Sequence, residues 1–196
     1  MTEQSKIGCV VMAAGSARRF GSNKLKIELD GQSLFRRSLD AVPVQQFESV
    51  VVVTQYPEFE ALIRDRGFTL IRNDKPELGL SHTIHLGLKA LEDCDAVLFQ
   101  VADQPLLQQE SVEELCELWR KEPEKIAIFC HGERRGNPCI FPARFFQELM
   151  AIEGDRGGSV VIKAHPEAIL RKEVPEEELF DVDTAQAFAE LSARSE

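Results

Sequence analysis

The chain has 196 residues, of which 43% are apolar, and its formal net charge is −10. This length is enough for one sizeable α/β domain and short for two, so we expect a single domain over residues 1–196. An acidic chain is a poor candidate for binding nucleic acid or an anionic membrane, and we find neither a signal peptide nor an apolar run of bilayer length.

The N-terminal half is predicted to alternate between strands and helices. Residues 49–54 read S-V-V-V-V-T, a run without polar alternation that is typical of a strand buried on both faces. The predicted elements are a strand 7–12, an extended piece 26–31, a helix 34–41 capped by Ser33, a strand 49–54, a helix from Pro57 to a stop at Gly67, a strand 68–71, a turn-rich loop 73–81 and a helix 81–91.

The C-terminal half continues the alternation. The predicted elements are a strand 96–101, a helix 109–121, a strand 125–130, a polar segment 132–137, a short segment 138–141, a helix 143–151, a glycine-rich loop 154–158, a helix 159–164, a strand 169–174, an extended piece 179–183 and a last helix to Ala193 capped by Thr184. The acidic run 173–178 is interpreted as solvated surface.

This alternation predicts a mostly parallel sheet with helices on both faces. Ligands of such sheets bind outside the carboxyl ends of the strands. The loops that follow Met12, Ile71 and Val101 should therefore lie at one edge and could form one site.

The five cysteines favour a reduced protein. Their number is odd, no C-x-x-C pair occurs, and most lie in apolar runs, at Cys9, Cys94, Cys116, Cys130 and Cys139. Such a set is typical of buried thiols rather than of a disulfide framework or a zinc site. The four histidines show no metal-ligand spacing. We therefore expect a cytoplasmic protein.

The stretch after the first strand has the chemistry of an anion site. It reads A-A-G-S-A-R-R-F-G-S-N-K over residues 13–24. Small residues let backbone N–H groups approach an anion, while Arg19 and Lys24 supply countercharge. The spacing of Gly15 and Gly21 fits neither a Walker loop nor G-x-G-x-x-G. We interpret the stretch as a cradle for a nucleoside triphosphate; the alternative is a glycine-rich connection with solvated basic residues.

Carboxylates follow two predicted extended segments. Asp103 comes directly after the strand 96–101, and Pro105 forces Gln104 to be extended, so the Asp103 carboxylate would project at the mouth of the sheet. Beside a triphosphate, Mg²⁺ usually takes one or two protein carboxylates. Asp181 and Asp183 share one face of an extended segment and could supply the second. The alternatives are a helix N-cap or turn role for Asp103 and a helix-capping role for the later pair.

Six motifs occur in order over residues 13–184 and together resemble the molybdenum cofactor cytidylyltransferases, within the MobA-like nucleotidyltransferase family. They are A-A-G-S-A-R-R-F-G-S-N-K, N-D-K-P-E-L-G-L-S-H-T-I-H-L-G, V-A-D-Q-P, R-G-N-P-C-I-F, G-D-R-G and F-D-V-D-T. Each motif alone is weak, but six in order are a strong signal.

The resemblance implies a Rossmann-like three-layer nucleotidyltransferase fold and Mg²⁺-dependent transfer of CMP from CTP to molybdopterin, with release of pyrophosphate. Lys24, Arg19 and Asp103 would be catalytic, and a molybdenum hydroxylase is an implied partner. The nucleotide contacts would be Ala13, Ala14, Gly15, Gly21, Lys24, Gly79, Leu80 and Ser81. The metal ligands would be Asp103 with Asp181 or Asp183. The acceptor contacts would be Gly136, Asn137, Pro138, Gly154 and Asp155.

Some positions depart from the family pattern. The G-D-R-G-G-S run at 154–159 lacks an arginine expected to meet the acceptor phosphate, unless Arg156 substitutes. The A-A-G triplet at 13–15 favours CTP, because guanylyl-transferring relatives tend to have A-G-G. Two alternatives remain open: an enzyme of the same fold acting on a sugar phosphate or another small phosphate, and a non-catalytic carrier of molybdopterin. The joint presence of Lys24 and Asp103 favours an enzyme.

Overall fold

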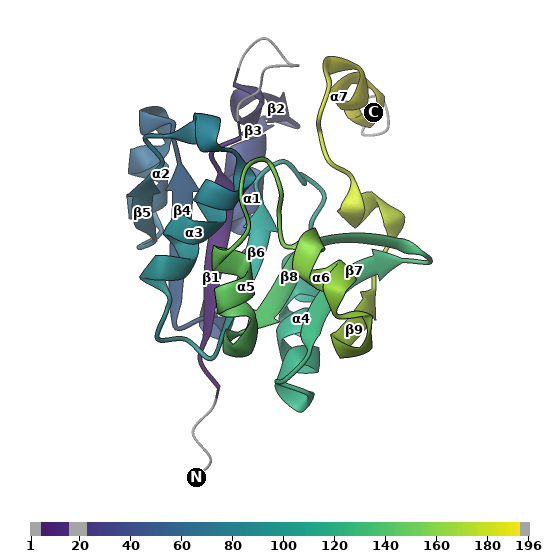
Figure 1. Ribbon diagram of the computed structural model, residues 1–196. Helices are drawn as coiled ribbons and strands as arrows, with labels where there is room; N and C mark the ends of the chain where they lie inside the picture. Colours follow the sequence, from purple (N-terminus) through teal and green to yellow (C-terminus); the bar gives the residue numbers. More distant parts are fainter. Residues whose placement is uncertain (1–4, 16–22, 193–196) are drawn as a thin grey trace.

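In the computed structural model, which describes residues 5–15 and 23–192, a seven-stranded sheet forms the centre of the molecule (Figure 1). Its strand order is β5-β4-β1-β6-β8-β7-β9, and a two-stranded sheet pairs β2 with β3. The strands are β1 (Ile7–Ala13), β2 (Glu28–Leu29), β3 (Gln32–Ser33), β4 (Ser49–Thr54), β5 (Thr69–Arg72), β6 (Ala96–Val101), β7 (Ile126–His131), β8 (Arg134–Pro142) and β9 (Ile169–Glu173). In the large sheet every neighbouring pair is parallel except those of β8, which is antiparallel to β6 and β7. The mostly parallel, mixed sheet is confirmed.

Helices cover both faces of this sheet, which gives three layers (Figure 1). One face is covered by α1 (Leu34–Asp40), α2 (Glu60–Asp65) and α4 (Gln109–Lys121). The other face is covered by α3 (Leu80–Ala90), α5 (Phe146–Met150) and α6 (Ser159–Ala164). Helix α7 (Ala185–Ser192) packs against the β2–β3 region. In β4, Val50 and Val52 pack into the core beneath α1, α2 and α4, while Val51 and Val53 pack into the core on the opposite face, beneath α3, α5 and α6. Each buried valine stabilises the fold by about 2 kcal/mol. The run without polar alternation is therefore a strand buried on both faces, as predicted.

Strand β8 is the main departure from the predicted elements. The polar segment 132–137 and the segment 138–141, separate in the prediction, contribute to one nine-residue strand. The outer part is exposed at Arg134 and Arg135, so polar side chains stay solvated there. A register shift in the pairing with β7 leaves Asn137 and Pro138 outside the ladder, where the missing N–H of proline is tolerated. Periodicity fails here because this arm has no continuous buried face.

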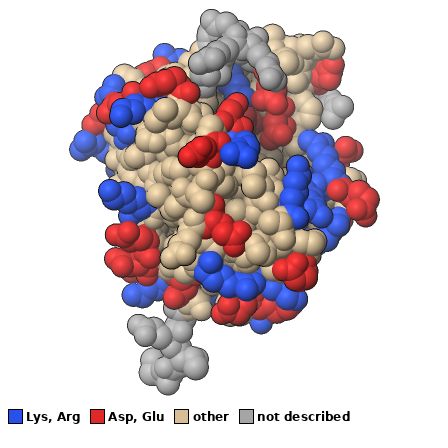
Figure 2. All heavy atoms as spheres, viewed as in Figure 1, with Lys and Arg blue, Asp and Glu red and all other residues tan. Residues whose placement is uncertain are grey.

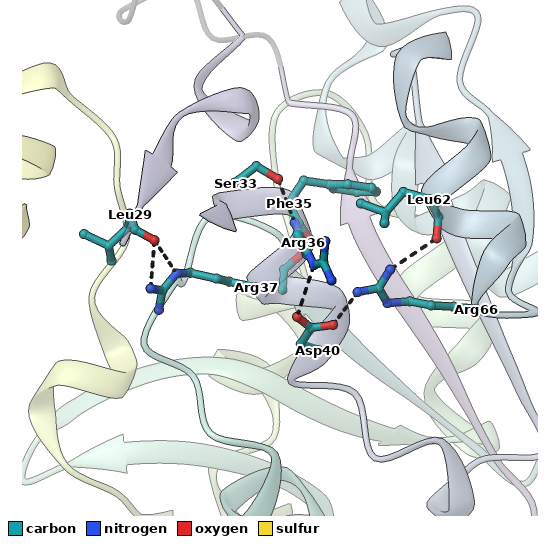
Figure 3. Close-up of polar contacts among 9 residues, drawn as sticks. Leu29, Ser33, Phe35, Arg36, Arg37, Asp40, Leu62 and Arg66 are labelled. Atoms are coloured by element: carbon teal, nitrogen blue, oxygen red, sulfur yellow. Dashed lines mark hydrogen bonds and ion pairs between the residues drawn. The ribbon is translucent and has the colours of Figure 1, made fainter. Parts of the chain in front are cut away.

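The β2–β3 hairpin is tied to α1 (Figure 3). The guanidinium of Arg37 donates to the carbonyl oxygen of Leu29 through two nitrogens, at 2.8 and 3.1 Å. The predicted N-cap is confirmed, since Ser33 Oγ accepts the N–H of Arg36 at 3.2 Å. The hairpin directly follows the segment that carries Lys24, so these contacts fix where that segment enters the fold.

One acid of the run 173–178 is buried, which corrects the expectation of a wholly solvated surface. The side chain of Glu178 is 3% exposed, and its carboxylate accepts the N–H of Gln108 at 3.1 Å and the hydroxyl of Ser111 at 2.8 Å. A carboxylate is stabilised at a helix N-terminus, where backbone N–H groups lack intrahelical partners. Glu178 therefore attaches the C-terminal segment to the start of α4.

All five cysteines are free and buried, as predicted. Over residues 5–15 and 23–192, no helix is both long enough and apolar enough to cross a bilayer. Acidic and basic side chains are interspersed over the face seen in Figure 2, and uncharged side chains gather over its middle.

Candidate active site

A cavity of about 620 Å³ opens at the carboxyl ends of β1 and β6. The carboxyl ends of neighbouring parallel strands lie at one edge, which is why loops distant in the sequence meet here. The predicted nucleotide residues Ala13, Ala14, Gly15, Lys24, Gly79 and Leu80 line this cavity, as do Asp103 and Asp183. The predicted residues Arg19 and Gly21 lie outside the described part of the chain.

The main chain at the end of β1 is held from one side by three consecutive side chains. Thr54, Gln55 and Tyr56 donate to the carbonyl oxygens of residues 13–15 at 3.0, 2.8 and 2.9 Å. Because a trans peptide points its N–H opposite to its C=O, the N–H groups that share peptides with the first two carbonyls point away from these donors. This support was not predicted, because no motif links T-Q-Y to a strand that precedes it by 41 residues.

Lys24 lies between two carboxylates. Its Nζ is 2.6 Å from Oδ2 of Asp103 and 3.1 Å from Oδ1 of Asp183. Burial alone would lower the pKa of Lys24, but the charges and hydrogen bonds of the two acids outweigh burial and raise the pKa above its ordinary value of 10.5. Asn23 caps the short helix η1 (Lys24–Lys26) by accepting the N–H of Leu25 at 3.1 Å, and the Leu25 side chain is buried. The backbone at Lys24 is therefore anchored.

The segment before α7 brings Asp181 and Asp183 to the turn after β6. Buried Val182 donates its N–H to the carbonyl oxygen of Asp103 at 2.9 Å, which brings the flanking Asp181 and Asp183 beside that turn. Burial raises the pKa of Asp181 to about 6, and the negative charges of Asp103 and Asp183 add to the rise. Next to them, Thr184 Oγ1 accepts an N–H of α7 at 3.1 Å, as the predicted cap.

Replacing Asp181 by Asn is expected to stabilise the protein at neutral pH. Folding raises the pKa of this carboxyl from 3.8 to about 6, so ionisation is a cost that is absent below about pH 4 and complete above about pH 6. We expect the free energy of unfolding to rise by about 1–2 kcal/mol at about pH 7 and to stay unchanged at about pH 4. The rise is smaller than the full pKa shift would give, because the side chain is partly exposed and water screens its charge. Urea unfolding in metal-free buffer measures both values, and the same change at both pH values would contradict the expectation.

The arrangement fits a divalent cation on the chemistry of its donors. Within residues 5–15 and 23–192, no three His, Cys, Asp or Glu side chains form a ready metal cage. Mg²⁺ beside a triphosphate needs only one or two carboxylates, together with phosphate oxygens and water. Asp103 and Asp183 already direct one oxygen each at a single cation, the ammonium of Lys24. Asp103 and Asp183, two of the three predicted metal ligands, are therefore close enough together to contact the same cation.

The main chain at the start of α3 is in direct contact with the main chain of the loop before α6. Ser81 donates its N–H to the carbonyl oxygen of Gly154 at 3.1 Å, and the N–H of Leu80 lies 3.4 Å from Oδ1 of Asp155. Ser81, a predicted nucleotide contact, is only 3% exposed, does not line the cavity and uses its N–H in this tie. At Gly79 φ is +84°, and a Cβ there would lie 2.6 Å from the carbonyl carbon of Gly154. Only glycine fits this approach.

Gly79→Ala is expected to lower the free energy of unfolding by about 2–3 kcal/mol. The backbone conformation is unfavourable for any residue with a side chain, and the new Cβ would meet main-chain atoms that cannot turn aside. Gly31→Ala is the matched control: its φ of +76° is also positive, but a Cβ there meets no atom within 4 Å, so the expected loss is about 1 kcal/mol. Urea unfolding compares the two, and equal losses would mean that the close loop packing adds no constraint.

A second cavity of about 620 Å³ adjoins the first. The two share four wall residues, Met12, Leu80, Val101 and Asp155. Much of the second cavity is apolar, with Phe99 of β6 and Phe141 of β8 in edge-to-face contact at 6.0 Å between ring centroids. Its charged lining residues are Arg135, Asp155, Arg156 and Lys163.

The predicted acceptor residues divide between the cavities. Gly136, Asn137 and Asp155 line the second cavity, and Asp155 borders the first as well. Gly154 lines the first cavity, because the glycine-rich loop forms the partition between them. Pro138 is buried in β8 and lines neither. Arg135 and Lys163 were not among the predicted site residues. Arg135 begins the R-G-N-P-C-I-F motif, so a signal was present there, whereas Lys163 lies on α6 outside all six motifs.

Residues 9–169 match the model of a family described as the MobA-like NTP transferase domain. A relative in sequence is the purine catabolism protein PucB of Bacillus subtilis, which is 28% identical over 193 residues, 91% of this chain and 92% of that protein. Among solved structures, Rv0371c from Mycobacterium tuberculosis has a TM-score of 0.80 at 18% identity and covers 97% of this chain and 100% of its own. A nucleotidyl transferase from Methanothermobacter thermautotroptrophicus has a TM-score of 0.80 at 19% identity, with 96% and 97% covered.

The structural matches confirm the predicted Rossmann-like nucleotidyltransferase fold, which these neighbours share over nearly their whole lengths. The family match is more specific than the fold, because it extends from β1 to the start of β9 and so includes the segments that bring Lys24 and Asp103 together. This chain therefore belongs to the family of MobA-like NTP transferase domains and is a nucleotidyltransferase.

Proposed function

We propose that this protein is a cytidylyltransferase that moves CMP from CTP to the phosphate of a molybdopterin-type acceptor and releases pyrophosphate. The observation that carries the proposal is the pair of adjoining cavities. One has Lys24 and Asp103 at the sheet edge where nucleotides bind, and the other, across a shared wall, combines apolar and cationic side chains. Two substrates held in these cavities would meet at the wall between them.

In this reaction an oxygen of the acceptor phosphate attacks the α-phosphorus of CTP. The bond from that phosphorus to the oxygen bridging the β-phosphate breaks, and its electron pair leaves with pyrophosphate. The acceptor phosphate is ionised at neutral pH, so no side chain has to remove a proton. The main task of the protein is to align two polyanions and to neutralise their charge.

The residues of the first cavity suit this task. The main chain at 13–15, supported by residues 54–56, would position the nucleotide, and Lys24 would bind its phosphates. By their motif alone, we assign Arg19 and Gly21 to the same phosphates. Asp103 and Asp183 would hold Mg²⁺, with Asp181 beside them. When bound, Mg²⁺ neutralises charge on the phosphate oxygens as the α-phosphorus is attacked.

The second cavity supports an acceptor with a flat apolar body and an anionic group. The apolar wall of this cavity, which includes the exposed side chain of Val160, offers contact area for a planar heterocycle, and the buried rings of Phe99 and Phe141 support that wall from the core. Arg135, Arg156 and Lys163 line the same cavity with one acid, Asp155. This surplus of positive charge favours a phosphate over a neutral acceptor. We propose a molybdenum hydroxylase as the protein that receives the product.

Three further solved structures are in keeping with these substrates, although their similarity is one of fold alone. CMP:2-keto-3-deoxy-manno-octonic acid synthetase, solved with CTP, has a TM-score of 0.74 at 15% identity. Molybdopterin-guanine dinucleotide biosynthesis protein A from Archaeoglobus fulgidus has a TM-score of 0.71 at 16% identity. Rv0371c has also been solved in complex with manganese, with a TM-score of 0.76 at 18% identity.

Pyrophosphate release with CTP, GTP, ATP and UTP, each with and without molybdopterin, tests the proposal. We expect rapid release only with CTP and molybdopterin together, and its loss when EDTA removes the metal. Faster release with another nucleotide would refute the assignment of CTP. Release with a sugar phosphate but not with molybdopterin would refute the acceptor and favour the alternative enzyme of the same fold.

A further inference from the structure

The ammonium of Lys24 occupies the position of a cation between Asp103 and Asp183, at 2.6 and 3.1 Å from their oxygens. We propose that in the free protein this ammonium is a built-in substitute for the divalent cation, which must displace it. Lys24 would then turn from the two carboxylates to the triphosphate as the metal enters. The proposal rests on the nucleotide and metal site of the proposed function and adds a rule for how that site is loaded.

The charges argue that Lys24 and a metal exclude each other. The Lys24 and Asp103 side chains are only 15% and 22% exposed, so water screens their charges weakly. A divalent cation bound to the same two carboxylates would lie within a few ångströms of the ammonium and repel it. In its absence, the acids at 103, 181 and 183 need a counterion, and Lys24 supplies one.

The local structure permits the exchange. Leu25 is buried and Asn23 caps η1, so the backbone at Lys24 is held while its side chain reaches into the cavity. A lysine ammonium is a point charge on a four-carbon stem that can rotate to a new anion without backbone movement. Asp183, the second partner, has a side chain that is 60% exposed, so this contact is the easier one to break.

A loading rule follows from this exclusion. A metal that arrives alone must break both ion pairs and leave Lys24 without an anion, so it should bind weakly. A triphosphate offers Lys24 a new partner and brings its own oxygens to the metal. Metal and nucleotide should therefore bind with positive cooperativity, and the cooperativity should require the charge of Lys24.

Titration of the nucleotide-free protein with Mn²⁺, with free Mn²⁺ followed by electron paramagnetic resonance, tests the proposal. Lys24→Met keeps most of the side-chain length and removes the charge. We expect it to bind Mn²⁺ about tenfold more tightly than the unmodified protein, within the usual range of coupling between sites. Lys26→Met is the matched control, because Lys26 lies on the same short helix as Lys24 but is exposed. Its Nζ pairs with Glu58 at 2.9 Å. Its Mn²⁺ affinity should be unchanged.

Asp103→Asn combined with Lys24→Met locates the effect. The gain in affinity should vanish if the metal binds at Asp103, and a gain that persists would overturn the proposal. Equal or weaker binding by Lys24→Met, with a native circular dichroism spectrum, would overturn it too. Should Lys24→Met not fold, Lys24→Gln serves for the same comparison. Because this readout needs neither CTP nor an acceptor, tighter Mn²⁺ binding by Lys24→Met together with no pyrophosphate release by the unmodified protein would refute the proposed function and leave the competition between Lys24 and the metal standing.

Discussion

Asp103→Asn is expected to reduce turnover by about two to three orders of magnitude while the protein remains folded. The substitution removes the charge of a carboxylate that would hold Mg²⁺ in the reacting complex, and losses of this size are typical when a preorganised electrostatic contact is removed. The fold should tolerate the change, because Asn has nearly the same shape and the carbonyl oxygen of residue 103, which accepts the N–H of Val182, is retained. Pyrophosphate release at saturating CTP, acceptor and Mg²⁺ measures the effect.

Asp74→Asn is the control for this measurement. Asp74 follows β5 near the same edge of the sheet, but its side chain is 78% exposed and pairs with Arg72 rather than lining the cavity. Its turnover should stay within about twofold of the unmodified protein, as for most surface substitutions. Turnover of Asp103→Asn in that same range would exclude a catalytic role for the Asp103 carboxylate.

Lys24→Met is expected to reduce turnover by about two orders of magnitude, even though it should bind metal more tightly. The two effects have one cause: the ammonium that competes with the metal in the free protein would neutralise phosphate charge in the reacting complex. Turnover as a function of Mg²⁺ concentration checks this. The loss should persist at saturating Mg²⁺, and Lys26→Met should behave like the unmodified protein. Recovery of full turnover with added Mg²⁺ would mean that Lys24 acts only through the metal.

The strands and helices of the fold were largely predictable from local patterns. The strands β4 and β6 and the helices α4 and α6 match the predicted ranges at both ends. Each of these strands is buried on both faces, so its sequence is almost entirely apolar, apart from Ser49 and Thr54 in β4 and Gln100 in β6. The polar half of β8 gave no such signal, because its side chains stay in water and only the pairing with β7 makes it a strand.

The candidate site was predictable in part. The residues at 13–15, 24 and 103 could be selected because small residues at a strand end and charged residues beside a turn have local chemical meaning, whereas Gly79 was selected only through the resemblance to a known family. Glu178 could not be distinguished from its acidic neighbours, although it alone of them is buried at the start of α4. The difference lies in its partners, and these are distant in the sequence.

By itself, the sequence determined the kinds of segment this protein forms and the order in which its reactive side chains occur along the chain. Burial and backbone preference act over a few residues, and a pattern of a few residues is enough to record them. Only the tertiary structure decided that Lys24 would lie between Asp103 and Asp183, that residues 54–56 would support the end of β1, and that two cavities would share one wall. These are contacts between segments far apart along the chain, and their geometry is fixed by the packing of the whole sheet and its helices.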